Sequence, residues 1–245
     1  AAFMSQTAMA DNARIENGSA QWTIAISPSN SSSGNGNAKA TGPTSIAAGW
    51  NATATGENSI AMGYDASTAT DPISATDQRI LTQTNPSDKT KYNIAIGTKS
   101  KSGGLQTIAL GAESYAARTQ SIAFGFDSQA TGDQSVALGA NTRAQGNSSV
   151  AIGGDDLDSV ASTVYRQTSA TADNDAYNDT PLAQTYRQLT GQNLVNFTPG
   201  NRYIGTTTGQ AGVAVGVSSK AADLATAVGT KSHATGNHSV AFGVG

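Results

Sequence analysis

The chain has 245 residues, enough for one large or two ordinary domains, but its large apolar side chains are scarce. Aromatic residues make up 6% and charged residues 13% of the sequence, the formal net charge is −3, and there is no cysteine. This composition excludes a thick conventional core, a disulfide framework and a thiolate metal site, and it offers no basic surface for nucleic acid. We find no apolar run of the roughly 18 residues that span a bilayer and no signal-peptide pattern, so we expect an excised or mature soluble piece of a protein.

Residues 1–44 follow only in part the repeat that governs the rest of the chain. Thr23-Ile24-Ala25-Ile26-Ser27 is typical of a degraded copy of the first half of the repeat, and residues 38–42 copy its second half. We therefore expect irregular N-terminal turns or a cap over residues 1–44, followed by a domain of regular repeats over residues 45–245.

From Ser45 onward a block of the form Ser-Ile-Ala-x-Gly recurs, usually every fourteen residues. The step from Gly216 to Gly229 is one residue short, and two other steps contain twenty and forty-nine extra residues. These excesses predict loops inserted into the stack at about 71–92 and 159–209. The glycine of the block occurs ten times, at Gly49, Gly63, Gly97, Gly111, Gly125, Gly139, Gly153, Gly216, Gly229 and Gly243.

Each position of the repeat, numbered from its serine, has its own chemistry. The third position is alanine in all ten copies, the second is Ile or Val except at Thr226, and the fourth is always apolar. The eighth, tenth and twelfth positions are mostly small, whereas the ninth and eleventh vary among polar and large residues. Alternation of this kind indicates a strand with one face in water. Fourteen residues therefore predict two short strands and two turns, which is an all-β parallel solenoid.

The first strand of each repeat is apolar on both faces, although its own roll can cover only one of them. We expect the third-position alanines to face the small residues of the second strand, which turns the second and fourth positions outward. Large apolar side chains left in water would form an unusually large patch, so we predict a homo-oligomer. The alternative is a monomer whose large residues fill the roll. The predicted interface consists of Ile46, Ile60, Met62, Ile94, Ile96, Ile108, Leu110, Ile122, Phe124, Val136, Leu138, Val150, Ile152, Val213, Val215, Val228, Val240 and Phe242.

Blocks such as Ala-Thr-Ala-Thr-Gly-Glu-Asn-Ser-Ile-Ala-Met-Gly at residues 52–63 resemble the head repeats of YadA-like trimeric autotransporter adhesins. The block at residues 130–139 carries the same likeness. The resemblance implies a left-handed parallel β-roll, trimeric about an axis lined by the second- and fourth-position residues. It also implies a place on the outer surface of a Gram-negative bacterium and binding to extracellular matrix proteins, host cells, abiotic surfaces or other bacteria. Membrane attachment would come only through a stalk and anchor, which these residues do not contain.

The second insertion is rich in aromatic and arginine residues, which are enriched where proteins bind partners. They form the candidate ligand surface, but an excursion of this length also needs a small core of its own, which the aromatics could supply. We expect the first insertion to be a solvated loop. The candidate ligand residues are Tyr165, Arg166, Tyr177, Tyr186, Arg187, Phe197 and Tyr203.

No residues of the chain form a convincing catalytic, metal or cofactor site. Asp155, Asp156 and Asp158 suggest a calcium turn, but the cluster occurs once, and a charged loop entry explains it better. His233 and His238 lack a third ligand and are expected on the surface. We therefore predict neither an enzyme nor a cofactor. An ice-binding solenoid would need stacked threonines, which the ninth position lacks, and a phage-fibre solenoid is a further alternative.

Overall fold

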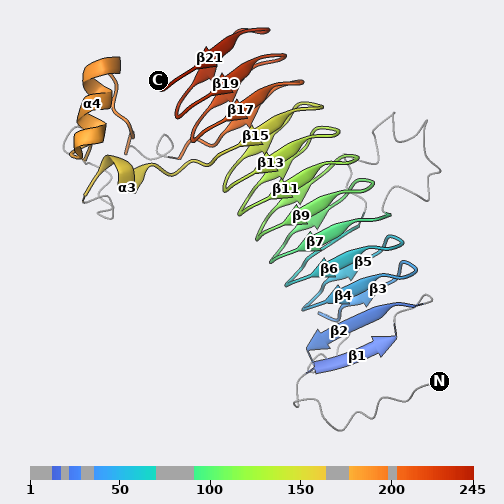
Figure 1. Ribbon diagram of the computed structural model, residues 1–245. Helices are drawn as coiled ribbons and strands as arrows, with labels where there is room; N and C mark the ends of the chain where they lie inside the picture. Colours follow the sequence, from blue (N-terminus) through green and yellow to red (C-terminus); the bar gives the residue numbers. More distant parts are fainter. Residues whose placement is uncertain (1–12, 18–21, 29–35, 70–90, 164–176, 198–202) are drawn as a thin grey trace.

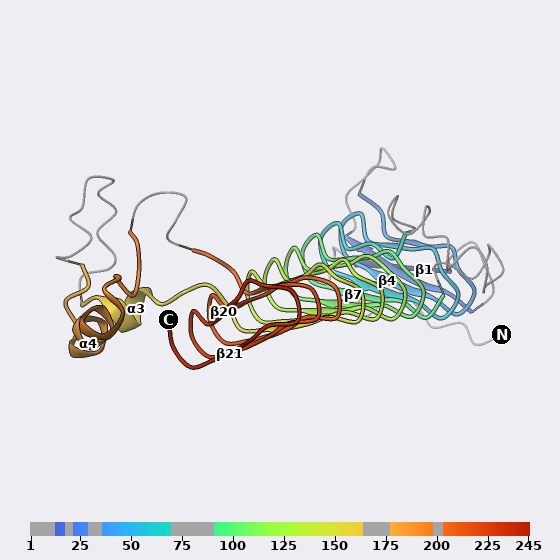
Figure 2. The ribbon, with the colours of Figure 1, turned by 90° about the horizontal axis from the view of Figure 1, so that it is seen from above.

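The structure is a computed structural model that describes residues 13–17, 22–28, 36–69, 91–163, 177–197 and 203–245. These residues wind into a long stack of narrow turns, with a pair of helices beside its C-terminal part (Figure 1). Viewed from above, successive turns appear as flattened loops of similar shape, each offset from the one before it (Figure 2). The predicted all-β parallel solenoid is thereby confirmed.

The first strands of the repeats form a twelve-stranded sheet in sequence order. All neighbours pair in parallel except β1 and β2, which are antiparallel at the N-terminal edge. Equivalent positions of successive repeats lie side by side, as Ile122, Ala123 and Phe124 do with Val136, Ala137 and Leu138. The strands are β1 (Ala13–Asn17), β2 (Ile24–Pro28), β4 (Ile46–Ala48), β6 (Ile60–Met62), β7 (Ile94–Ile96), β9 (Ile108–Leu110), β11 (Ile122–Phe124), β13 (Val136–Leu138), β15 (Val150–Ile152), β17 (Val213–Val215), β19 (Thr226–Val228) and β21 (Val240–Phe242).

The second strands form the opposite wall of the roll and are only two residues long. Seven of them form one parallel sheet and two form another, with single bridges from Ser67 to Thr53 and to Lys101 connecting the two. Residues 38–42, predicted to be half a repeat, supply the first of these strands. The strands are β3 (Lys39–Ala40), β5 (Thr53–Ala54), β8 (Lys101–Ser102), β10 (Tyr115–Ala116), β12 (Gln129–Ala130), β14 (Arg143–Ala144), β16 (Thr207–Thr208), β18 (Lys220–Ala221) and β20 (His233–Ala234).

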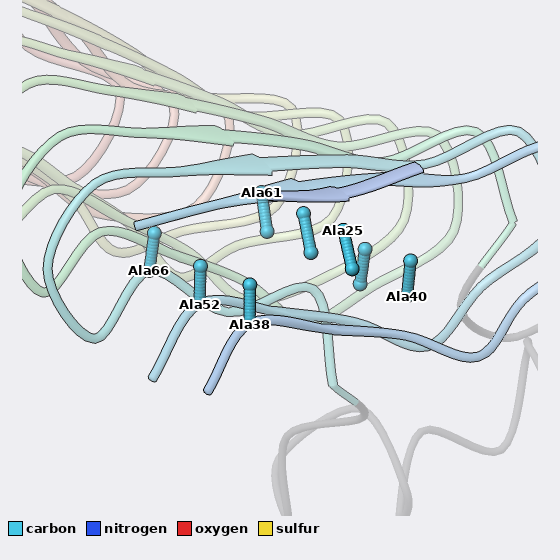
Figure 3. Close-up of a cluster of buried hydrophobic side chains, with 8 residues drawn as sticks. Ala25, Ala38, Ala40, Ala52, Ala61 and Ala66 are labelled. Carbon is cyan, nitrogen blue, oxygen red and sulfur yellow. The ribbon is translucent and has the colours of Figure 1, made fainter. Parts of the chain in front are cut away.

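The interior between the two walls is built almost entirely from methyl groups. Ala61 and Ala25 project from the first wall toward Ala38, Ala52 and Ala66 of the second (Figure 3). The third-position alanines have 0% of their surface exposed from β4 through β19. Because such side chains fill so little space, the two walls lie close together, and apart from alanine the fully buried side chains of the roll are Ser, Thr and one Asn, Asn93.

Buried hydroxyl groups line both ends of this interior and donate to backbone carbonyls three residues earlier, in the corner that precedes each strand. At one end the Ser121 hydroxyl donates to the Arg118 carbonyl at 2.6 Å, and the Ser135 hydroxyl donates to the Gly132 carbonyl at 2.7 Å. At the other end the Ser128 hydroxyl donates to the Gly125 carbonyl at 3.1 Å. Since a buried hydroxyl without a partner is costly, these bonds explain why Ser or Thr recurs at the first and eighth positions.

Two corners close each turn, and we name them by their place in the repeat. The first corner comprises the fifth to seventh positions, after the first strand, and the second corner comprises the twelfth to fourteenth. Both contain residues with positive φ, including non-glycine residues at the seventh and fourteenth positions such as Asp127 (44°) and Gln120 (56°). Hydrogen bonding between stacked corners, as from Asp127 N to Ala112 O at 3.0 Å, stabilises these conformations.

The second insertion was predicted as a loop, but its described residues contain two helices, α3 (Asp158–Ala161) and α4 (Pro181–Thr190). The Thr180 hydroxyl accepts a hydrogen bond from Ala183 N at 3.2 Å, Pro181 is the first helical residue, and Gly191 ends the helix at φ 72°. These residues are ordinary signals for the start and end of a helix, and they can be recognised from the sequence alone. The chain is back in the roll by β16, inside the range expected for the loop.

The fifth-position glycine should tolerate no side chain within the stack. A Cβ on Gly125 would lie 2.6 Å from the Gly139 carbonyl oxygen, whereas a Cβ on Gly243, at a similar φ of 121°, would meet nothing within 4 Å. Gly125→Ala is therefore expected to lower the free energy of unfolding by roughly 1–3 kcal/mol more than Gly243→Ala does. Urea denaturation followed by circular dichroism measures both, and equal losses would show that the contact between turns does not limit this position.

Candidate functional site: an apolar ladder and an inserted helical lobe

The second- and fourth-position side chains point away from the alanine interior and form the apolar ladder, defined as the predicted interface residues. Phe124 is 46% exposed, Met62 42% and Ile122 37%, while most other members are half-buried. The partial burial comes from stacking, because in-register neighbours lie about 4.8 Å apart along the roll and cover one another. Exposure rises at the uncovered C-terminal end, to 66% for Val240 and 72% for Phe242.

The ladder is accompanied by large apolar side chains at the sixth position, which the sequence analysis missed. Trp50, Tyr64 and Phe126 are 42%, 51% and 54% exposed, each two residues after the fourth-position residue of its own repeat. The continued spacing of two was the signal that could have found them. The exposed apolar surface of the roll is therefore wider than the two predicted columns.

The described part of the second insertion forms a separate small unit, the helical lobe, comprising residues 157–163 and 177–197. Its core consists of Leu157, Ala161, Ala183, Tyr186, Leu194, Val195 and Phe197, with Tyr177 packed against it. The rings of Tyr177 and Phe197 are tilted to each other with centroids 5.5 Å apart. The Asn178 side chain is also buried and exchanges two hydrogen bonds with the Val195 backbone, at 2.9 and 3.0 Å.

The structure thus distributes the candidate ligand residues among several environments. Tyr186 and Phe197 are 6% and 8% exposed, so these two rings serve the core of the lobe and present little surface to a ligand. Arg187 is half-buried on α4, and Tyr203 is 52% exposed. Tyr165 and Arg166 lie outside the described residues. Of the two roles considered for the aromatics, packing accounts for Tyr177, Tyr186 and Phe197.

The lobe rests on the first corner of the C-terminal turns. Lys231 Nζ donates to the Asn193 and Leu194 carbonyls at 3.0 and 3.2 Å and lies 5.0 Å from the centre of the Tyr186 ring. Burial lowers the pKa of Lys231, as expected for an ammonium group taken partly out of water. Val217, one turn earlier, packs against the core of the lobe.

The three carboxylates at the start of the insertion, Asp155, Asp156 and Asp158, accept hydrogen bonds from other groups of the protein. The Asp155 carboxylate accepts from Asn141 Nδ2 at 2.8 Å, and Asp156 Oδ1 accepts from the Asp158 backbone N–H at 2.8 Å. Asp158 Oδ2 accepts from the Tyr203 hydroxyl at 2.8 Å. Within the described ranges no group of three or more His, Asp or Glu side chains could hold a metal ion.

The two histidines lie apart on the roll, His233 on β20 and His238 at a second corner, and both are exposed. The His233 ring nitrogen Nε2 lies 3.2 Å from the Ser218 carbonyl. Neither described helix, α3 nor α4, has the length and apolarity that crossing a bilayer requires.

Comparison with protein families gives a match to the YadA head domain repeat at residues 40–66, 94–114, 102–128, 119–142, 130–155 and 222–245. The chain contains a YadA-like head domain. The matched segments cover most of the regular turns but omit those of β16, β17 and β18, and they leave out both insertions, so the helical lobe is an addition to the YadA-like repeat. No curated protein matches the chain in sequence. YadA-like heads are, in general, trimeric adhesins displayed at the bacterial outer membrane.

Lys231 is expected to hold the helical lobe against the roll. Lys231→Met removes both hydrogen bonds to the lobe carbonyls, and bonds of this charged type contribute about 1.5–3 kcal/mol each before solvent screening. Hydrogen exchange of the α4 amides should therefore become roughly tenfold faster, while amides of β11 and β13 stay unchanged. Lys220→Met, on the outward face of β18, is the matched control. Equal exchange rates in the two variants would contradict this role.

Proposed function

We propose that the chain assembles as a homotrimer through the apolar ladder and acts as an adhesin head on the bacterial surface. The observation that carries this proposal is the exposed ladder running along a twelve-stranded sheet whose inner face is already filled by alanine. The YadA-like repeats support the same conclusion, because heads of this family are trimeric adhesins. The proposed role is structural and adhesive, in line with a family that is in general non-enzymatic.

The energetics favour association over a free monomer. The ladder contains eighteen Ile, Val, Leu, Met and Phe side chains, and complete burial of such a side chain contributes roughly 1.5–3 kcal/mol. Stacking within one chain removes only part of this surface from water. A continuous stripe of this length exceeds the few hundred Å² of apolar patch that soluble monomers usually expose, and a second copy has the complementary surface.

The outward face of the second wall argues against an ice-binding role. Tyr115 of β10 lies in register between Lys101 of β8 and Gln129 of β12, and Arg143 follows on β14. This column therefore mixes charged, aromatic and amide side chains along the described turns and forms no threonine ladder. Such a chemically mixed surface suits recognition of varied surfaces by an adhesin.

The trimer is testable by placing charge in the ladder. Ile122→Asp together with Phe124→Asp would bring six carboxylates close to the trimer axis, where burial of unpaired charge is very costly. We expect native mass spectrometry to show trimers for the unmodified chain and monomers for the double variant. The control, Tyr115→Asp with Gln129→Asp, places the same charges on the outward face of the second wall and should remain trimeric. A monomeric unmodified chain at micromolar concentration would overturn the proposal.

Adhesion can be assigned to the roll or to the insertion by deletion. The chain and a variant with residues 156–204 replaced by a short Gly-Ser linker should be screened against immobilised collagen, fibronectin, laminin and an abiotic surface. We expect the roll to keep most of the binding, because the aromatics of the lobe are largely buried in its own core. Loss of all binding on deletion would instead move the ligand surface to the lobe. A polar depression of about 440 Å³ beside Lys99, Lys101 and Tyr115 is the first place on the roll to mutate.

A further inference from the structure

The helical lobe leaves the roll at the first corner and stays on that side. The chain departs after Gly153 and Gly154, which are fifth- and sixth-position residues, and the lobe then rests on Val217 and Lys231, which belong to first corners of later turns. The ribbon accordingly shows α3 and α4 beside the C-terminal turns and not over either wall (Figure 1). The lobe thus projects from the first-corner edge of the roll, beside the C-terminal turns.

The outer surface of the lobe has an apolar stripe that its own docking does not use. Ala183 and Tyr186 form the buried face of α4, whereas Leu182 and Leu189 are 59% and 81% exposed. These two leucines are seven residues apart, so they lie on the same side of the helix, two turns from each other. Both leucines therefore point away from the core of the lobe.

The second corner lies on the opposite edge of the roll, and its side chains change from polar to apolar in the turns beside the lobe. In the middle turns its fourteenth-position column is polar: Gln134 Nε2 donates to Gln120 Oε1, and Gln120 Nε2 donates to Gln106 Oε1, both at 3.0 Å. Beside the turns that carry the lobe, the column becomes Ala211 and Leu224, and both side chains are exposed.

A leucine at position 224 is expected to destabilise an isolated chain. Its φ is 55°, a conformation that disfavours bulky side chains, and its side chain is 57% exposed, so burial within its own roll does not offset the strain. Together with Ala211 it makes an apolar patch on the second corner, between the polar residues Ser148 and His238 of the same column; the exposed aromatics of this column, Trp22 and Tyr92, lie toward the N-terminal end of the stack.

Cyclic assembly brings these two edges together. When copies share an axis parallel to their rolls and turn their ladders toward it, the strands of all copies run the same way around the axis. The first corner of one protomer therefore adjoins the second corner of the next, at the same height, in a heterologous contact that closes into a ring.

We propose that the helical lobe of each protomer clasps its neighbour in the trimer, with Leu182 and Leu189 packing against Ala211 and Leu224 of the adjacent copy. This inference rests on the proposed trimer and assigns the insertion a role in assembly. The contact is continuous with the ladder interface, and it covers the exposed leucines on both edges. The occupant of the apolar stripe is thus a second copy of this chain.

The absence of cysteine from the chain allows a direct test by cross-linking. Leu189→Cys combined with Leu224→Cys, treated with a short bismaleimide, should give covalent trimers on a denaturing gel, because each protomer then links to the next around the ring. Either single variant should remain monomeric on the gel. The matched control, Leu189→Cys with Gln120→Cys, places the second thiol in the same corner column several turns away and should not cross-link.

The outcomes separate this inference from the proposed function. Trimers by native mass spectrometry without cross-linking, or equal cross-linking in the Gln120 control, would overturn the clasp and leave the trimeric head intact. Monomers by native mass spectrometry would overturn the proposed function itself. A second measurement does not depend on cross-linking. The double variant Leu182→Ser with Leu189→Ser should raise the dissociation constant of the trimer roughly tenfold or more. The control double variant, Gln184→Ser with Gln188→Ser, changes other residues of the same helix and should leave that constant unchanged.

Discussion

The packing of alanine methyl groups between the two walls is the constraint on which the rest of the structure depends. The third-position alanines are fully buried from β4 through β19 and face equally small residues of the second wall. An interior this thin has no room for Ile, Leu or Phe, so the large apolar residues of the same strand are turned outward. The exposed ladder is therefore a direct consequence of the alanine interior, since alternate side chains of a strand must point to opposite faces.

The same thinness makes every turn depend on its neighbours. A single turn buries little apolar surface by itself, and its backbone groups bond to the turns before and after it, as Gly125 N does to Leu110 O at 2.8 Å. Stability in such a stack is a sum over contacts between adjacent turns, and its open ends are its least covered parts. The high exposure of Phe242 and Val240 on the last strand reflects this rule.

The helical lobe follows a different principle from the roll that carries it. It has its own core of aromatic and aliphatic side chains, and Lys231 and Val217 of the roll contact it. The YadA-like repeat match leaves it out, which is consistent with an insertion at a corner where the stack can be interrupted without loss of register. β15 still pairs with β17 in register, across more than sixty residues of sequence.

The sequence by itself determined the solenoid, the fourteen-residue turn and the orientation of the ladder, because in-register stacking turns a periodic sequence directly into columns of equivalent side chains. Trp50 and Phe126 could also have been predicted as part of the apolar surface, because the alternation of the first strand continues past the fifth-position glycine. The helix α4 could likewise have been predicted from its capping residues Thr180 and Gly191. Only the tertiary structure decided which aromatics of the insertion are buried, where the lobe rests and which leucines stay exposed. Those outcomes depend on contacts such as Lys231 with Asn193, between residues that no repeat relates and whose separation in sequence predicts nothing about their distance in space.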